Sequence, residues 1–277
     1  MKTTKAILLG ALLSAAASLC AASVQAGEAL DAIMKDKMLV VGSNSDYRPN
    51  AFMGDDNQLQ GFDIDVSKEV AKRLGVDVKF VTPGWEVMTA GRWSGRWHMV
   101  VGSMTPTKAR AEVLDFPAVY YYTPAAFAVH KNSKATSLEE LNGKTIGVVG
   151  SSTYHKYLQH NLEINAVGVP EFEYKVKPGE IKLYGDINEF DELALGDGVR
   201  LDALVQSVTV IQEAIKKGLP IKQLGDPIFY EPLAIAIDKG DKEFADKLAS
   251  IVEDMKKDGT LAKLSVKWHG ADLVTTK

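Results

Sequence analysis

Short apolar runs that suit β-strands alternate with stretches of helical periodicity, and this alternation occurs twice along the chain. In the first series, residues 38–43, 77–81 and 98–102 are predicted strands, and residues 62–74 carry apolar side chains at every fourth position, which predicts a helix. Strands that alternate with helices are typical of βαβ units. The pattern therefore predicts an α/β fold with a mixed, mostly parallel sheet flanked by helices.

The second series repeats the rhythm after residue 140 and continues almost to the C-terminus. Its predicted strands are residues 145–149, 201–205 and 233–237, and its predicted helices are residues 153–162, 208–217 and 244–255. Two such series predict two α/β lobes rather than one continuous domain.

Two proline-containing segments separate the series and look like crossings between lobes. They are residues 120–124 and residues 229–232, each flanked by extended apolar sequence. Proline fixes the backbone in a conformation that suits extended connectors. Two lobes joined by two such segments would enclose a cleft that can close around a ligand.

Composition excludes several classes of function. The 277 residues are 46% hydrophobic and 25% charged, as in ordinary globular proteins. The formal net charge of −4 gives no basic excess for nucleic-acid binding. The five histidines form no metal-binding signature, and no nucleophile elbow, phosphate loop or dinucleotide fingerprint occurs. We therefore expect no metal, no cofactor and no nucleic-acid partner.

The N-terminus has the features of a cleavable signal peptide. Lys2 and Lys5 precede an apolar run over residues 6–17, and small residues follow up to Ala26. The run is too short for a membrane-spanning helix. We expect residues 1–26 to be a signal peptide cleaved after Ala26, which places the mature protein in the periplasm.

The single cysteine lies inside this leader. Cys20 follows Leu19, whereas a lipoprotein signal needs a small residue there, so lipid anchoring is not expected. The mature chain then has no cysteine and must be stabilised without disulfides.

A set of short motifs occurs in a fixed order along nearly the whole predicted mature chain: residues 39–42, 47, 61–66, 102–105, 110, 115–116, 147–148, 151–154 and 200–203. This set resembles the periplasmic solute-binding proteins of ABC importers, of the polar amino-acid type (bacterial extracellular solute-binding protein family 3). The resemblance implies a two-lobed periplasmic-binding-protein fold of type II. It assigns residues 27–122 and 232–277 to lobe one and residues 123–231 to lobe two.

Arg110 is the strongest candidate for binding a carboxylate. It follows Thr105-Pro106-Thr107, a helix-start signature whose free N–H groups are expected to point outward. A guanidinium beside a helix start can add two charge-assisted hydrogen bonds to a carboxylate. The resemblance implies that Arg110 binds the ligand α-carboxylate. The alternative is a surface arginine paired with Glu112 or Asp115.

A second candidate is the loop at residues 150–153, between a predicted strand and a predicted helix. Such loops lie at the carboxyl ends of strands, where ligands bind in α/β sheets. Ser152 and Thr153 could donate hydrogen bonds to the same carboxylate, although an ordinary N-cap serine gives the same pattern. The resembled family usually has glycine where Ser151 stands.

The resemblance implies further pocket residues in lobe one. Tyr47 and Trp85 would offer aromatic faces. Asn44 would touch the ligand side chain, and the remaining positions, Gly102, Ser103 and Thr105, would offer backbone and hydroxyl groups. Trp93 and Trp97 match no pocket position and are expected to take part in core or surface packing.

One position departs from the resembled family. Members that bind α-amino acids usually have an aspartate for the ligand ammonium where this chain has Ser207. A serine cannot neutralise an ammonium, and a buried unpaired charge costs several kcal/mol. Either another acid, Glu86, Asp46 or Glu231, replaces the aspartate, or the ligand lacks a free primary α-amine.

Residues 167–179 appear as an insertion relative to the resembled family. We expect this segment to form an extra flap or hairpin on lobe two.

The resemblance implies a monomeric, non-enzymatic binding protein. It would capture an amino acid or a related carboxylate-bearing solute between its lobes and deliver it to the membrane permease of an ABC importer. The alternative is a periplasmic dehydratase of the cyclohexadienyl type, which shares the fold. Those enzymes are thought to have a catalytic glutamate where this chain has Val210, which argues against dehydratase activity.

Overall fold

The computed structural model describes residues 28–185 and 188–275. The predicted signal peptide therefore lies outside the described residues. Eight strands form the main sheet: β1 Met38–Gly42, β5 Asp77–Val81, β6 Met99–Met104, β7 Leu114–His130, β8 Thr145–Val149, β9 Glu180–Tyr184, β10 Ala203–Ser207 and β11 Ile221–Asp238. A separate small sheet contains β2 Asp46–Tyr47, β3 Ala51–Met53 and β4 Leu59–Gln60.

Helices cover the main sheet. Those of the N-terminal part and the C-terminus are α1 Glu28–Asp36, α2 Phe62–Leu74, α3 Trp85–Thr89, α4 Lys108–Ala111, α8 Lys242–Lys257 and α9 Thr260–His269. Those of the middle part are the 3-10 helix η1 Leu138–Leu141 and the helices α5 Thr153–Leu158, α6 Glu189–Ala194 and α7 Val208–Lys216. Among the described residues, no helix combines the length and the apolar character needed to cross a bilayer.

The main sheet has the order β5-β1-β6-β11-β7-β10-β8-β9. β1 runs parallel to β5 and β6, and β8 runs parallel to β9 and β10. The two long central strands, β7 and β11, pair antiparallel with each other and with their outer neighbours, β10 and β6. The sheet is therefore parallel on both sides of an antiparallel centre, as the predicted mixed sheet requires.

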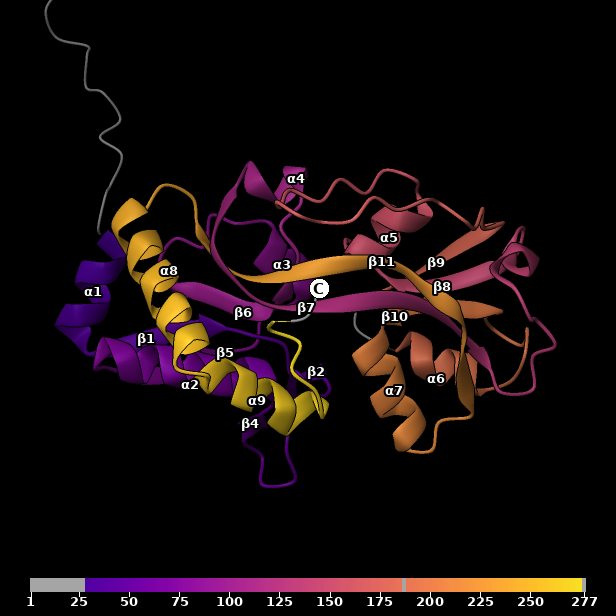
Figure 1. Ribbon diagram of the computed structural model, residues 1–277, viewed down its shortest axis with the longest axis horizontal. Coiled ribbons are helices and arrows are strands. Elements are labelled where there is room, and N and C mark those ends of the chain that lie inside the picture. The colour runs from indigo at the N-terminus through magenta and orange to yellow at the C-terminus, as the bar shows by residue number, and fades with distance from the viewer. Residues whose placement is uncertain (1–27, 186–187, 276–277) are drawn as a thin grey trace, which may run out of the picture.

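The two predicted crossings are parts of β7 and β11, which run side by side through the middle of the molecule (Figure 1). Tyr230 lies opposite Pro124, and Pro232 lies opposite Tyr122. The sequence predicted connectors at these prolines, whereas the structure has continuous strands of 17 and 18 residues. The prolines are compatible with a strand because an extended backbone accommodates their fixed φ.

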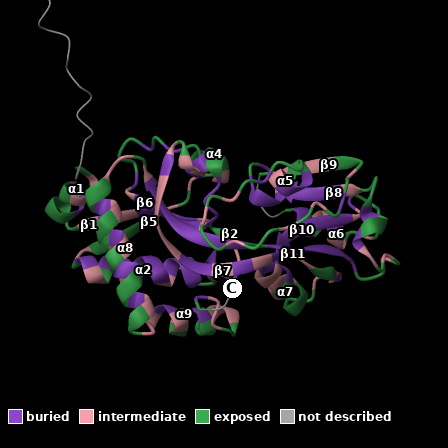
Figure 2. Cartoon of the chain, turned by 45° about the horizontal axis from the view of Figure 1, so that its top comes forward, coloured by how far each residue is buried: buried purple, intermediate pink, exposed green. Residues whose placement is uncertain are grey.

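Buried side chains gather in two groups on either side of this centre. One group comes from residues 33–121 and 233–274, and it includes Trp93 and Trp97, so core packing is the correct one of the two expected roles. The other comes from residues 125–229. We call the surrounding parts lobe one and lobe two; their buried strands and exposed outer helix faces are seen in Figure 2.

Residues 167–179 form neither a strand nor a helix, so of the two expected forms, a flap or a hairpin, the hairpin is wrong. The segment lies along lobe two, where Phe172 and Tyr174 pack against Tyr157, and Phe172 also contacts Phe229. The Tyr157 hydroxyl donates to Glu173 O and accepts from Lys175 N–H. Aromatic packing, rather than strand pairing, fixes this segment.

The helix predicted over residues 153–162 ends earlier, at Leu158. His160 has a φ of 57°, which stops the helix, and its ring stacks on Tyr174. Propensity alone could not reveal this tertiary contact.

A buried polar network lies inside lobe one. Asp63 is fully buried at the start of α2 and accepts hydrogen bonds from the Tyr120 hydroxyl (2.7 Å) and the Ser103 hydroxyl (2.9 Å). The Tyr121 hydroxyl donates to Ser103 Oγ, and Ser103 N–H donates to the Tyr120 hydroxyl. Burial raises the pKa of Asp63 to about 6, against the lowering effect of these two hydroxyls.

We predict that Asp63 makes the protein less stable as the pH rises from about 4 to about 6. Its pKa is higher in the folded protein than in the unfolded chain, so the fold loses the favoured neutral carboxyl over this window. Asp63→Asn mimics the neutral form, so this variant should not show the decrease in the free energy of unfolding, on the order of 3 kcal/mol, that we expect over this pH range. Urea unfolding at pH 4, 5, 6 and 7 measures the difference, with the exposed Asp31→Asn as the matched control. Parallel pH curves for Asp63→Asn and the unmodified protein would contradict this assignment.

Candidate functional site

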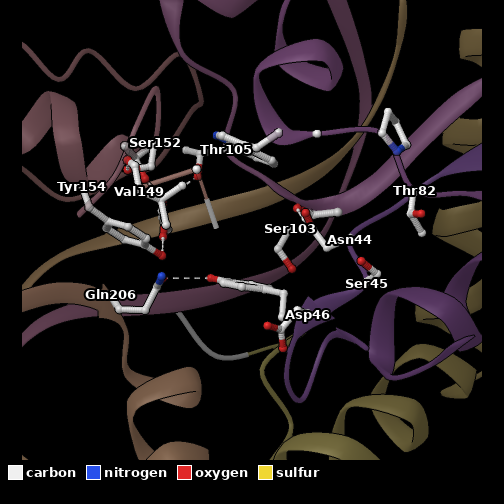
Figure 3. A pocket seen from close by; sticks show the side chains of 18 of the residues that line it. Asn44, Ser45, Asp46, Thr82, Ser103, Thr105, Val149, Ser152, Tyr154 and Gln206 are labelled. Carbon is white, nitrogen blue, oxygen red and sulfur yellow. Dashed lines mark hydrogen bonds between the residues drawn. The ribbon is translucent and has the colours of Figure 1, made fainter. Parts of the chain in front are cut away.

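A cavity of about 260 Å³ lies between the two lobes. Both lobes contribute side chains that point toward one another across it, Asn44 and Ser45 from one side and Tyr154 and Gln206 from the other (Figure 3). Its lining consists of Asn44, Ser45, Asp46, Tyr47, Thr82, Pro83, Gly84, Trp85, Gly102, Ser103, Thr105, Arg110, Val149, Ser152, Thr153, Tyr154, Gly185, Gln206 and Glu231.

With one exception, the residues that the sequence singled out as ligand-binding line this cavity; the exception is Ser207. The Ser207 hydroxyl is 2.8 Å from Thr123 Oγ1 and 2.8 Å from Thr209 Oγ1, and the side chain is not part of the lining. In this structure the Ser207 hydroxyl therefore bonds to two threonines.

The side chain of Arg110 is a buried cation at the junction of the lobes. Its residue is 7% exposed, and its guanidinium donates to Thr105 O of lobe one (2.8 Å) and to Ser151 O of lobe two (2.9 Å). A guanidinium has five N–H donors, so three N–H groups remain beyond these two bonds. The alternative of a surface arginine paired with Glu112 or Asp115 is therefore wrong.

The surroundings of Arg110 favour an anionic ligand. Burial lowers its pKa to about 10, and the nearby Glu231 acts in the opposite direction, so the group is still a cation at neutral pH. The guanidinium lies 5.0 Å from the centre of the Trp85 ring, a cation–π arrangement. The buried Trp85 indole N–H has no hydrogen-bond partner among the described residues.

Two of the N–H groups at the start of the helix that carries Arg110 are already bonded, which differs from the expectation of free N–H groups there. α4 has only four residues, and Thr107 caps it by accepting a hydrogen bond from Arg110 N–H. Lys108 N–H donates to Glu163 O of lobe two. The contribution of this segment to the cavity is the guanidinium itself.

The loop before α5 has the shape of a glycine turn although it contains a serine. Ser151 has a φ of 58°, and this left-handed conformation directs its carbonyl to Arg110. A non-glycine residue there costs roughly 1–2 kcal/mol. The Ser152 hydroxyl caps α5 and donates to Val149 O. Its side chain is therefore an ordinary N-cap, the alternative considered for this loop.

Glu231 is a buried carboxylate at the centre of the cavity wall. It is 1% exposed and accepts from the hydroxyls of Thr105 (2.5 Å), Thr153 (2.8 Å) and Tyr154 (2.7 Å). Burial raises its pKa, while the three hydroxyls and Arg110 lower it. The hydroxyl donors come from both lobes, and Glu231 itself lies on the crossing strand β11.

The lobe-one wall is fixed by the end of β6. Ser103 has a φ of 53°, and the Asp63 network described above holds it in this conformation. The Asn44 side-chain amide donates to Gly102 O. A Cβ on Gly102 would lie 3.3 Å from Asn44 Nδ2, so a glycine lets the Asn44 side chain approach this strand closely.

Direct contacts join the lobes around the cavity. The Tyr47 hydroxyl donates to Gln206 Oε1 (3.0 Å). Near α4, Thr107 and Ile164 form an antiparallel bridge, and Asn165 N–H donates to Pro106 O. Together with Arg110 and Glu231, these contacts describe lobes closed against each other.

The remaining lining residues had only weak signals in the sequence. Tyr154 belongs to the motif 151–154 that was used for the resemblance, and Gln206 lies close to the motif 200–203, yet only tertiary structure turns them to the cavity. Glu231 and Asp46 were named as acids that could replace an aspartate at position 207, and both line the cavity, whereas Glu86 does not. In the described part of the chain, no group of three or more His, Cys, Asp and Glu side chains is arranged to hold a metal ion.

Comparison with known proteins identifies relatives of the same size. The profile of the bacterial extracellular solute-binding proteins, family 3, matches residues 39–271. The L-cystine-binding protein TcyJ of Escherichia coli (strain K12) is 28% identical over 247 residues, which cover 88% of this chain and 87% of TcyJ.

Solved structures agree with this match. The ancestral amino acid-binding protein AncCDT-1, a precursor of cyclohexadienyl dehydratase, superposes with a TM-score of 0.74 at 31% identity, covering 87% of this chain and 99% of that chain. An ancestral arginine-binding protein bound to arginine gives a TM-score of 0.72 at 33% identity, covering 84% of this chain and 98% of that chain. The extent of the profile match, together with this shared two-lobed fold, shows that the chain belongs to the bacterial extracellular solute-binding proteins of family 3.

Proposed function

We propose that the protein is the substrate-binding component of an amino-acid ABC importer. It captures an amino acid or a related carboxylate-bearing solute between its lobes and delivers it to a membrane permease. We further propose that residues 1–26 are a signal peptide cleaved after Ala26 and that the mature protein works as a periplasmic monomer. The family, and relatives named for binding cystine and arginine, support this function.

We propose that the lobes meet at the crossing strands, with lobe one formed by residues 27–122 and 232–277 and lobe two by residues 123–231. Thr123 pairs with Glu231 in the register of β7 and β11, so the proposed boundaries face each other. Two adjacent strands can serve as a hinge when they bend together. A ligand that contacts both lobes then favours the closed state.

The buried guanidinium of Arg110 is the observation that carries the proposal. Its two backbone bonds orient it inside the inter-lobe cavity, and its remaining N–H groups can donate to a ligand α-carboxylate. A carboxylate there would compensate a buried cation. The aromatic rings of Trp85 and Tyr47 would enclose the ligand's stem.

We propose binding without chemistry, although AncCDT-1 is described as a precursor of a dehydratase. Val210, at the position expected to carry a catalytic glutamate in such enzymes, is 3% exposed on α7 and lies in the core of lobe two. It is not part of the cavity lining. A valine there can neither donate nor accept a proton.

Arg110→Ala should weaken binding of L-arginine or L-cystine, whichever binds more tightly, by roughly 30- to 1,000-fold, or about 2–4 kcal/mol. The loss follows because the variant removes the charge that pairs with the α-carboxylate. Isothermal titration calorimetry measures the dissociation constants, and a thermal melt checks that the variant is folded.

Arg96→Ala is the matched control. Arg96 also lies over an indole ring, that of Trp97, and also donates to a backbone carbonyl, but it is outside the cavity lining. Its removal should leave the dissociation constant within about twofold of the unmodified protein. An Arg110→Ala protein that binds as tightly as Arg96→Ala would refute the carboxylate assignment.

The protein should also give no turnover of prephenate. Ultraviolet absorbance over hours at micromolar protein concentration measures product formation. Turnover that scales with protein concentration and disappears in Arg110→Ala would overturn the view that this cavity only binds.

A further inference from the structure

The cavity lining contains an acidic side chain that the binding of a carboxylate does not use. Glu231 lines the same cavity as Arg110, and it is 1% exposed. Burying a carboxylate is costly unless charged or hydrogen-bonding partners compensate it. Its partners in the structure are three neutral hydroxyls and a guanidinium that acts on it through space.

Thr105 places this acid next to the carboxylate site. Its backbone carbonyl accepts from Arg110 Nη1, and its hydroxyl donates to Glu231 Oε2. One residue therefore holds both charged side chains in the same part of the cavity. An α-amino acid carries its ammonium and its carboxylate on the same carbon atom, so a cation site and an anion site held side by side match that pattern.

The hydrogen bonds of Glu231 leave room for one more donor. An ionised carboxylate has about four acceptor positions. Oε2 accepts from Thr105 and Thr153, whereas Oε1 accepts only from Tyr154. One position on Oε1 is therefore open to a donor from a ligand.

The other acids considered as partners for a ligand ammonium are placed less well. Asp46 lines the cavity but is exposed, in the small sheet with Tyr47. Glu86 is exposed on α3 and does not line the cavity. Ser207 is turned to Thr123 and Thr209, so the end of β10 offers no charge.

We propose that Glu231 is the binding group for the ligand's α-ammonium, so that the protein selects solutes with a free primary α-amine next to a carboxylate. This inference rests on the proposed function and extends it, because it names the chemical class of the solute. The ammonium of the bound solute would then compensate Glu231, and its carboxylate would compensate Arg110. Solutes whose amine is absent are then disfavoured, because they leave Glu231 unpaired.

Pairs of compounds that differ only in the α-ammonium test the proposal. They are L-arginine and 5-guanidinopentanoate, L-cystine and 3,3′-dithiodipropionate, and L-glutamine and glutaramate. Calorimetry should show that the protein binds at least one amino acid of these pairs and prefers it to its amine-free counterpart by roughly 10- to 100-fold or more. Equal affinity within a pair overturns the proposal without any variant.

Glu231→Gln then assigns the preference to this side chain. It keeps the size of the side chain and removes the charge, so the amino acid should bind roughly 10- to 100-fold more weakly. The amine-free counterpart should bind as before or more tightly, because a buried negative charge no longer opposes its carboxylate. Asp238→Asn, on the same strand but outside the cavity lining, is the matched control and should keep the full preference.

The outcomes separate this inference from the proposed function. If the unmodified protein binds none of the three amino acids, the proposed function fails and the inference fails with it. If it binds one and Glu231→Gln keeps the preference for the amine, only the inference fails. Loss of the preference in Asp46→Asn instead of Glu231→Gln would likewise overturn the assignment to Glu231.

Discussion

The site depends on a guanidinium that is buried between two parts of the chain. Arg110 donates to Thr105 O on one side and to Ser151 O on the other, and it lies over Trp85. A cation at this depth is costly unless partners compensate it, and carbonyl dipoles compensate it only in part. Under the proposed function, a bound carboxylate would supply the opposite charge, and ligand binding would then be coupled to lobe closure. Ser151 accepts a left-handed backbone conformation to take part in this arrangement.

The second constraint is the pair of long strands that crosses between the lobes. Their backbones are continuous through Tyr122 and Pro232, and Glu231 projects from one of them into the cavity. Hydroxyl donors from both lobes converge on this carboxylate. Any hinge motion here would therefore change the surroundings of Glu231 as well as the width of the cavity. If the proposals hold, recognition of a zwitterion and closure of the lobes use the same few residues.

Periodicity predicted much of the fold because local pattern and tertiary role agree over most of it. The helix over Phe62–Leu74 and the strand over Thr145–Val149 have the predicted limits, since the helix buries one regular face and the strand is a short apolar run that is buried almost throughout. Prediction failed where distant contacts decide the conformation. Residues 167–179 follow the aromatic ring of Tyr157 rather than a neighbouring strand, and no local pattern encodes that choice.

The candidate site could be predicted where the local sequence pattern agrees with the tertiary role. Its prediction failed where distant contacts decide the conformation. Arg110 follows a recognisable turn, and its neighbourhood matched a family pattern over the whole chain. The orientation of Ser207 away from the cavity depends on Thr123, which lies far from it in sequence. The roles of Tyr154 and Gln206 likewise arise only when the lobes meet. Sequence therefore located the cavity, whereas the distribution of charge within it required the structure.

A crystal structure of the protein with L-arginine or L-cystine bound tests the central claim most directly. The account predicts the amino acid between the lobes, with its α-carboxylate within hydrogen-bonding distance of the Arg110 guanidinium. A ligand bound outside the inter-lobe cavity, or one whose carboxylate has no contact with Arg110, would contradict it.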